Sequence, residues 1–254
     1  MIGDSQSCLM NNSNTKIIIL AAGRGSRLGA ITDEIPKALV KIGASSCLEQ
    51  QLKIYQSIGY TNINVVTGFQ AQKFSRFKLI NNIYNLNWNK SNMLTSLLTG
   101  LENSNTCTTL ISYGDIMFEV DAIESIENSI PDISILYDTN FLEYWNLRNS
   151  NPLSDLESFK IHSDGLIYDI GQKPLDLSEI EGQYMGILKI TSKGWTELLN
   201  YLDQEKITII NNLSMTEFLS GFISKGGKVY GVPFSGKWCE IDTYSDLVIA
   251  NKLF

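Results

Sequence analysis

The chain has 254 residues with 20 basic and 27 acidic side chains, a formal net charge of −7 and 43% hydrophobic residues. This composition is ordinary for a globular protein with a sizeable core. The acidic balance argues against a nucleic-acid partner, because such surfaces need a basic face to neutralise phosphates. No run of about 20 apolar residues occurs, so we also expect no membrane span.

The N-terminal segment, residues 1–15, lacks the charged start and apolar core of a secretory signal peptide. We expect it to form a disordered lead before the folded part of the chain. The four cysteines, Cys8, Cys47, Cys107 and Cys239, stand far apart, and no two of them have Cys-x-x-Cys spacing. This spacing favours free thiols over disulfides or zinc ligands. Together these features predict a cytoplasmic protein.

The first half of the chain alternates between strand-like and helix-like segments. Continuous apolar runs predict strands over residues 16–22, 62–68 and 107–115. Helices are predicted over residues 46–59, 91–102 and 121–130. A Ser46-x-x-Glu49 capping box begins the first of these helices, and Ser91 is expected to cap the second. The alternation predicts an α/β fold with a doubly wound, mostly parallel Rossmann-like sheet.

The pattern changes between Asp138 and Gly182, where alternating stretches around Ser163-Asp164-Gly165 predict a β-hairpin. We interpret residues 138–182 as a small β insertion that forms an acceptor-side wall or lid of a single domain, residues 16–254. Further strands are predicted over residues 182–191, 228–234 and 236–242. Further helices are predicted over residues 192–204, 214–227 and 243–254.

The segment LAAGRGSRLGAITDEIPKAL, residues 20–39, gathers glycines and cations directly after the first predicted strand. Glycine lets backbone N–H groups approach phosphate oxygens that a Cβ would keep away. The spacing fits neither a Gly-x-Gly-x-x-Gly dinucleotide motif nor a Walker loop. A glycine turn with solvated basic residues is the simpler explanation of a lone Gly-x-Gly. The full run, with Pro36 and Lys37 after Arg27, favours an anion site with a forked and a compact cation.

The pattern Gly23-x-Gly25-Ser26-Arg27-Leu28, followed by Pro36-Lys37, resembles the signature of nucleotidyltransferases that make nucleoside-diphosphate sugars and related activated alcohols. In that family the loop wraps a nucleoside triphosphate, and the arginine and lysine hold phosphates around the reacting α-phosphorus. The resemblance implies a GT-A-like nucleotidyltransferase fold and catalytic roles for Arg27 and Lys37. It also implies nucleotide binding by Leu20, Ala21, Ala22, Gly23, Arg24, Gly25 and Ser26.

Two predicted strands end in aspartate, Asp115 and Asp242. Ligands of open α/β sheets bind at the carboxyl ends of the strands, and Mg²⁺ takes one or two carboxylates together with phosphates and water. Taken alone, Asp115 is also typical of a turn after Gly114, and Asp242 of a helix cap. Each matches a place where the resembled family holds magnesium. The resemblance therefore implies that Asp115 and Asp242 bind Mg²⁺, with Gly114 beside the nucleotide.

The segment SNMLTSLLTGLE, residues 91–102, resembles the Asn-Met-x-x-Ser-Leu segment of cytidylyltransferases that act on small phosphorylated amines and phosphonates. This likeness implies that Asn92 and Ser96 line the cleft near CTP; polar residues that satisfy their own helix are the alternative. It implies an acceptor of the phosphoglutamine, phosphocholine or aminoethylphosphonate class and a role in capsule polysaccharide biosynthesis. Acceptor-binding residues are predicted at Lys173, Tyr184 and Trp238; for the aromatic residues Tyr184 and Trp238, core packing is the alternative.

The single histidine, His162, lies in the predicted hairpin and is interpreted as a surface residue. A phosphate acceptor needs no general base, because its second ionisation lies at about pH 6 and it is largely anionic at pH 7. We expect it to attack the α-phosphorus of CTP and release pyrophosphate, in a monomer or homodimer. Two alternatives remain. One is a hexose-1-phosphate nucleotidyltransferase, although residues 171–174 (GQKP) lack the glutamate of its Glu-Lys-Pro element; the other is a non-catalytic nucleotide-binding module.

Overall fold

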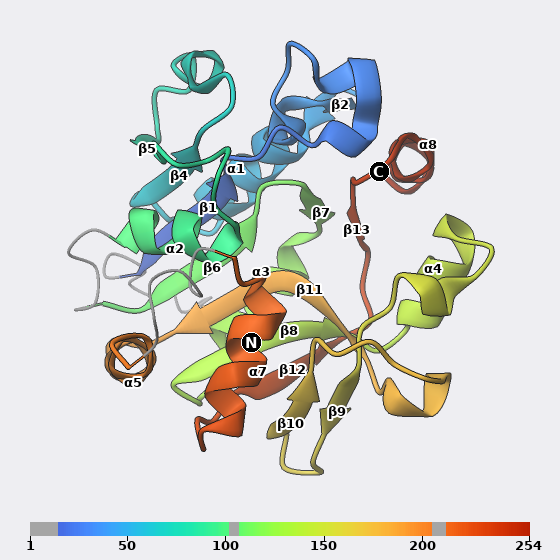
Figure 1. The fold of residues 1–254 in the computed structure, drawn as a ribbon. Helices are drawn as coiled ribbons and strands as arrows, with labels where there is room; N and C mark the ends of the chain where they lie inside the picture. The colour runs from blue at the N-terminus through green and yellow to red at the C-terminus, as the bar shows by residue number, and fades with distance from the viewer. Residues whose placement is uncertain (1–14, 102–106, 205–211) are drawn as a thin grey trace, which may run out of the picture.

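The computed structural model describes residues 15–101, 107–204 and 212–254 (Figure 1). Apart from Thr15, the disordered lead predicted for residues 1–15 lies outside the described residues, as does Cys8. Within the described part, Cys47, Cys107 and Cys239 form no disulfide. None of the helices described there is both long and apolar enough to cross a bilayer.

The main sheet of the described residues has seven strands. In spatial order they are β12 (Tyr230–Phe234), β8 (Ile133–Asp138), β11 (Gln183–Ile190), β6 (Thr109–Tyr113), β1 (Lys16–Ala21), β4 (Ile63–Thr67) and β5 (Asn81–Tyr84). Strand β11 is antiparallel to both of its neighbours, and every other pair in this sheet is parallel. The prediction of a mostly parallel, doubly wound sheet is therefore confirmed.

Short strands form three further pairs in the described residues. They are β2 (Lys41–Ile42) with β3 (Ser45–Ser46), β7 (Ile116–Phe118) with β13 (Trp238–Glu240), and β9 (Phe159–Ile161) with β10 (Ile167–Ile170). The last pair is the hairpin predicted around Gly165, which has the positive φ of 86° that a tight turn requires. The pair β7 and β13 joins the middle of the chain to its C-terminal part.

The helices begin and end largely where their capping signals predicted. They are α1 (Cys47–Ser57), α2 (Met93–Leu101), α3 (Val120–Glu127), α4 (Phe141–Arg148), α5 (Ser192–Leu202), α7 (Met215–Ser224) and α8 (Tyr244–Leu253). The capping box of Ser46 and Glu49 is formed. The cap predicted at Ser91 is wrong: its hydroxyl donates to the carbonyl of Asn87, and Asn92 Oδ1 accepts the first N–H of α2 at 2.8 Å.

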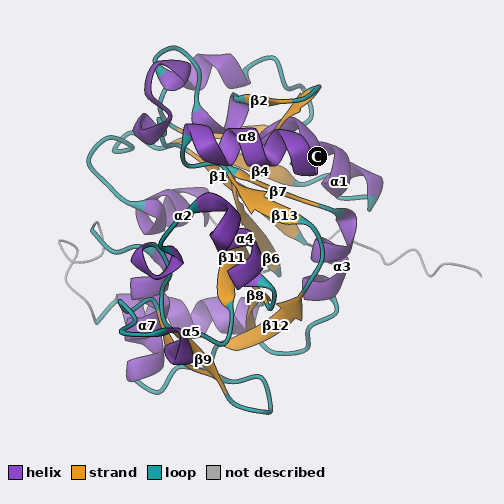
Figure 2. Cartoon of the chain, turned by 90° about the vertical axis from the view of Figure 1, so that its right-hand side faces the viewer, coloured by secondary structure: helices purple, strands orange, loops and turns teal. Residues whose placement is uncertain are grey.

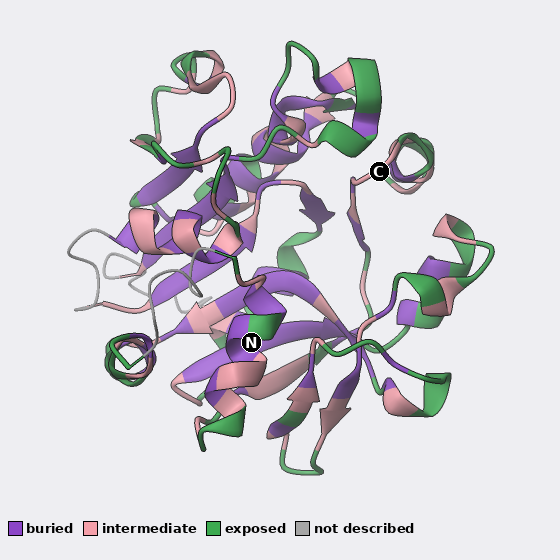
Figure 3. Cartoon of the chain, viewed as in Figure 1, coloured by how far each residue is buried: buried purple, intermediate pink, exposed green. Residues whose placement is uncertain are grey.

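The sheet is buried on both faces, because helices cover each of them. Figure 2 shows α2, α5 and α7 on one side of the strands and α1 and α3 on the other. In β1, Ile17 and Ile19 belong to the core beneath α1 and α3, whereas Ile18 and Leu20 belong to the core beneath α2 and α5. This explains why β1 reads as an uninterrupted apolar run. The inner strands β1, β4 and β8 are buried along their length, whereas the edge strands β5 and β12 and the outer sides of the helices are more exposed (Figure 3).

Residues 138–182 contain more than the predicted hairpin. They include the helix α4, which packs next to α8, and two single-turn 3₁₀ segments, Pro152–Ser154 and Leu177–Glu179. The insertion is therefore mixed α and β. Its helix α4 lies near β13 (Figure 1), on the side of the molecule that faces the viewer in Figure 2. Its interpretation as an acceptor-side wall or lid stays a prediction.

Candidate active site

A cavity of about 330 Å³ opens where β1 and β6 end. Its walls come from four parts of the chain: the glycine loop, the start of α2 with the loop before it, the end of β6, and the end of β13. The lining residues are Leu20, Ala21, Ala22, Gly23, Gly25, Arg27, Lys37, Ala38, Trp88, Ser91, Asn92, Met93, Ser96, Tyr113, Gly114, Asp115, Glu240 and Asp242. The size is typical of a small-molecule site, and the position is typical of ligand sites in α/β sheets.

The glycine loop brings the backbone and Lys37 close together. Gly25 has a φ of 76°, and a Cβ at this position would lie 2.8 Å from carbons of the Lys37 side chain. At Gly114 a Cβ would lie 2.8 Å from the carbonyl oxygen of Leu20. Larger residues at either position would push apart the two chain segments that form the floor of the cavity.

Two carboxylates from distant parts of the chain share one ammonium group. Lys37 Nζ lies 2.6 Å from Asp115 Oδ2 and also contacts Asp242 Oδ1, and an Arg27 guanidinium nitrogen lies 2.9 Å from the same Asp242 oxygen. The pairing of β13 with β7 causes this meeting, because the Ile241 N–H donates to the Asp115 carbonyl at 2.9 Å. The strand that ends at Asp242 thus lies directly beside Asp115.

The electrostatics of this cluster favour the charged form of Lys37. Burial alone would lower the pKa of Lys37, but the charges and hydrogen bonds of Asp115 and Asp242 outweigh it, and the net pKa is raised. Burial raises the pKa of the nearby Glu240 to about 7, against the opposing charge of Arg148. The cavity therefore holds a permanent cation between two aspartates, with a third carboxylate close by.

The same two aspartates suit a divalent cation. The described residues contain no cluster of three or more histidine, cysteine, aspartate or glutamate side chains placed to bind a metal. Mg²⁺ nevertheless needs only one or two carboxylate ligands from a protein when phosphates and water complete its coordination shell. Both carboxylates contact the Lys37 ammonium. This positive group therefore lies between the two carboxylates, as a bound metal cation would. The donor set therefore fits the metal.

The far wall of the cavity is formed by α2 and the loop before it. Asn92 and Ser96 both line the cavity, as the sequence predicted. Ser96 Oγ accepts a hydrogen bond of 3.0 Å from the buried amide of Asn85. Trp88, which was not predicted as a site residue, also lies in this wall. The sequence feature that accompanies Trp88 is Gly68. A Cβ at residue 68 would lie 2.3 Å from the Trp88 Cβ, so glycine is needed there for the Trp88 side chain to fit.

Two residues of the predicted nucleotide loop do not line the cavity. Arg24 forms an ion pair of 2.6 Å with Asp33, and its guanidinium lies over the Phe69 ring at 5.7 Å. Ser26 begins the short 3₁₀ segment Ser26–Thr32. The remaining residues that were predicted to bind the nucleotide or metal, together with Arg27 and Lys37, are all brought to the cavity.

The three predicted acceptor residues also lie away from this cavity. Lys173 Nζ donates to the carbonyls of Leu153 and Ser154 within the insertion. Trp238 is buried, and its indole N–H donates to Asp138 Oδ2 at 2.9 Å. Tyr184 packs edge-on against the cavity residue Tyr113, with 5.7 Å between ring centroids. Their acceptor-binding roles stay predictions.

The sequence is similar to those of known nucleotidyltransferases. The model of the MobA-like NTP transferase domain matches residues 17–137. Over 247 residues the chain is 29% identical to the CTP:phosphoglutamine cytidylyltransferase of Campylobacter jejuni, and the match covers 91% of this chain and 97% of that protein. The chain spans about half the length of other curated relatives that it matches, which are bifunctional proteins.

Two solved structures share the fold. A Bacillus anthracis protein with an attributed glucose-1-phosphate thymidylyltransferase activity superposes with a TM-score of 0.75 and 20% identity, covering 94% of each chain. The CTP:phosphocholine cytidylyltransferase of Streptococcus pneumoniae superposes with a TM-score of 0.70 and 18% identity, covering 94% of this chain and 98% of that one. The family model over residues 17–137, the full-length relative and the shared fold together confirm the resemblance to nucleotidyltransferases that the glycine loop carries.

Proposed function

We propose that the chain is a CTP-dependent cytidylyltransferase that transfers CMP to the phosphate of a small phosphorylated metabolite and releases pyrophosphate. The observation that carries this proposal is the meeting of Arg27, Lys37, Asp115 and Asp242 at one cavity. Cytosine and the acceptor class are supported by the similarity along nearly the whole chain to the phosphoglutamine enzyme of Campylobacter jejuni. We propose an acceptor of the phosphoglutamine, phosphocholine or aminoethylphosphonate class, of which this relative favours the first, and a role in capsule polysaccharide biosynthesis.

Asp115 and Asp242 are the residues that would hold Mg²⁺ in this reaction. When bound, the ion neutralises charge on the triphosphate and helps to orient it. The support for these ligands is the pair of carboxylates that share one cation at the cavity.

The chain's own cations and backbone would carry the rest of the catalysis. The glycine loop offers backbone N–H groups to the phosphates, and Arg27, whose side chain is 65% exposed, is free to turn from Asp242 toward them. Lys37 would neutralise charge that spreads over the nonbridging oxygens of the transition state. An acceptor oxygen bonds to the α-phosphorus while the bond from that phosphorus to the bridging oxygen breaks, and the electron pair leaves with pyrophosphate.

This chemistry requires no proton acceptor from the protein. The residues that line the cavity include no histidine, and His162 stacks on Tyr168 in the hairpin at 4.5 Å between centroids. A phosphate acceptor is already largely anionic at neutral pH. We keep the insertion, residues 138–182, as the acceptor side, because its residue Arg148 contacts Glu240 and Asp242 at the cavity edge.

The test is a matrix of nucleoside triphosphates against acceptors, read by pyrophosphate release and product mass. We expect turnover with CTP and an acceptor of the phosphoglutamine, phosphocholine or aminoethylphosphonate class. Lys37→Met and Arg27→Ala preparations serve as controls for a contaminating enzyme. Turnover only with a hexose 1-phosphate would replace this proposal by the sugar-nucleotide alternative, and nucleotide binding without pyrophosphate release from any pair would favour a non-catalytic module.

A further inference from the structure

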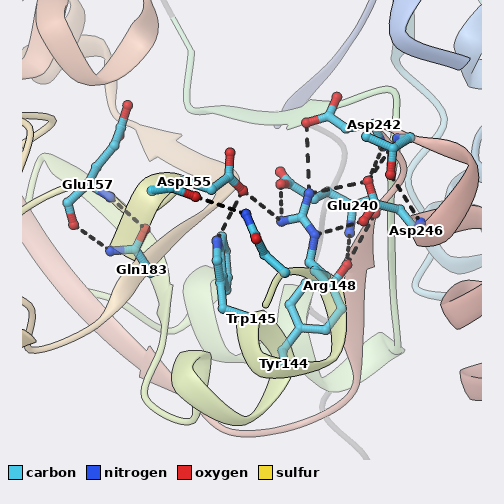
Figure 4. Close-up of polar contacts among 12 residues, drawn as sticks. Tyr144, Trp145, Arg148, Asp155, Glu157, Gln183, Glu240, Asp242 and Asp246 are labelled. Carbon is cyan, nitrogen blue, oxygen red and sulfur yellow. Dashed lines mark hydrogen bonds and ion pairs between the residues drawn. The ribbon is translucent and has the colours of Figure 1, made fainter. Parts of the chain in front are cut away.

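Arg148 is a buried arginine at the C-terminal end of α4, behind the cavity. Its side chain is only 5% exposed. The guanidinium lies 5.3 Å from the ring centroid of Tyr144 and 5.0 Å from that of Trp145. Figure 4 shows it between these rings and a group of carboxylates. A buried arginine is kept in place only where its charge and its donors are satisfied.

The carboxylates around Arg148 use all three of its nitrogens. Nε lies 2.9 Å from Asp246 Oδ1 and one terminal nitrogen 3.3 Å from Asp246 Oδ2, which is a forked contact. The other terminal nitrogen contacts Glu240 Oε1 and lies 3.8 Å from Asp155. The nearest oxygen of Asp242 is 3.9 Å away. With its donors occupied in this way, Arg148 is poorly suited to bind an acceptor directly.

Besides contacting Arg148, Asp246 accepts hydrogen bonds from the backbone next to the Asp242 side chain. Its Oδ2 accepts the N–H of Asp242 at 3.0 Å and the N–H of Thr243 at 2.8 Å. Asp246 also completes the capping box of α8 with Thr243. The buried carboxylate of Asp246 thus connects the Arg148 guanidinium to the backbone N–H of Asp242.

The other side of Asp242 is held from the same helix. The Tyr144 hydroxyl donates to the Glu240 carbonyl and accepts the Glu240 N–H, each at 3.1 Å. Tyr144 and Arg148 are four residues apart in α4 and therefore lie on the same helix face. One face of α4 thus holds the chain both before and after Asp242 (Figure 4).

We propose that Arg148 is a positioning residue for nucleotidyl transfer: with Tyr144 it fixes the segment from Glu240 to Asp246 so that the Asp242 carboxylate faces Asp115. This inference rests on the proposed function, in which Asp242 holds the metal. Lysine cannot replace the arginine here, because a single ammonium cannot span both oxygens of Asp246 and Glu240 at once.

The test measures Mn²⁺ binding in the presence of CTP, by the electron paramagnetic resonance signal of free Mn²⁺, beside steady-state kinetics and thermal unfolding. We expect Arg148→Lys and Tyr144→Phe each to weaken Mn²⁺ binding by about tenfold, the lower end of the effect of removing a residue that orients a metal ligand. Both variants should lower kcat at saturating substrates. Tyr144→Phe keeps the ring beneath the guanidinium, so it should fold even where an Arg148 variant does not.

Asp155→Asn is the matched control, because Asp155 contacts the same guanidinium but lies outside the connection to Asp242. Its side chain is 42% exposed, so its loss should change Mn²⁺ affinity by less than about twofold. Wild-type affinity in both Arg148→Lys and Tyr144→Phe would overturn the inference. An equal loss in Asp155→Asn would also overturn it, because Arg148 would then act through charge alone. A wild-type protein that binds CTP without Mn²⁺ would instead remove the metal role of Asp242 from the proposed function, and this inference with it.

Discussion

The substitution Lys37→Met removes the ammonium that Asp115 and Asp242 share and leaves two carboxylates side by side. The three side chains are only 12%, 22% and 14% exposed, so water screens the cluster weakly. At an effective dielectric constant of 20, each contact represents about 4 kcal/mol of gross attraction. Desolvation of the charged groups offsets much of this gain, and removal of one partner of a buried pair costs about 3–5 kcal/mol.

We expect the free energy of unfolding of Lys37→Met to fall by about 3 kcal/mol in EDTA, which lowers Tm by about 6–12 °C for a chain of this size. Circular dichroism during heating measures this change. Millimolar Mg²⁺ should restore part of the lost stability in the variant, because the metal takes the place of the ammonium between the carboxylates. Turnover, read by pyrophosphate release, should fall by about 10²–10³-fold and should not return with Mg²⁺.

The control is Lys193→Met, which also removes a lysine paired with an aspartate. Lys193 lies 2.6 Å from Asp132, but its side chain is 72% exposed, so both Tm and turnover should be unchanged. An unchanged Tm of Lys37→Met in EDTA would show that the shared ammonium does not hold the site together. Equal stabilisation of variant and wild type by Mg²⁺ would show that metal and ammonium do not compete for the same carboxylates.

Three further predictions concern the loop and the pH dependence of stability. Arg27→Ala should change Tm little, because the Arg27 side chain is 65% exposed and Asp242 keeps its contact with Lys37, but should lower turnover by about 10²-fold in the pyrophosphate assay. Gly25→Ala should lose both stability and turnover, because its Cβ would displace Lys37. Gly29→Ala, also at positive φ but with open space around it, should lose about 1–3 kcal/mol of stability in thermal unfolding and keep its turnover. Burial alone would raise the pKa of Glu49, but a lysine ammonium and the donors of its capping box lower it to about 2. The ionised Glu49 carboxylate therefore stabilises the fold above its unfolded pKa of about 4.3, and this contribution is lost as the pH falls toward 2. Glu49→Gln should reduce the change in the free energy of unfolding between pH 2 and 5, measured by urea unfolding, by about 1–2 kcal/mol.

The features that could be predicted from the sequence are those determined by residues close together in the chain. The apolar run of β1 and the glycine loop after it lie within one short segment, so their pattern is visible without tertiary structure. The capping boxes that begin α1 and α8 are likewise local. Asp115 and Asp242 were predicted because each follows a strand-like segment. The structure brings them together through the pairing of β7 with β13, which lies outside the main sheet.

The elements that were missed depend on distant parts of the chain. The helix α4 has no side-chain cap. Its aromatic residues Tyr144 and Trp145 pack in the core and also against the charge of Arg148. Strand β8 was not predicted, although residues 133–138 are fully buried; an apolar run of this length suits a helix or a strand equally well. The role of Lys173 in acceptor binding stays a prediction; its ammonium donates to the carbonyls of Leu153 and Ser154.

The charge of the cavity explains how an acidic chain can hold a triphosphate. Asp242 is approached by three cations from distant parts of the chain, Arg27, Lys37 and Arg148. Arg27 is exposed, and Lys37 lies against the glycine loop. In the proposed reaction both would exchange Asp242 for phosphate oxygens. Arg148 is buried and engaged with Asp246 and cannot make that exchange. In the proposed reaction Arg27 and Lys37 would meet the substrate, while Arg148 would keep the Asp242 carboxylate in place. The local cluster of cations thus opposes the net charge of −7 at the loop.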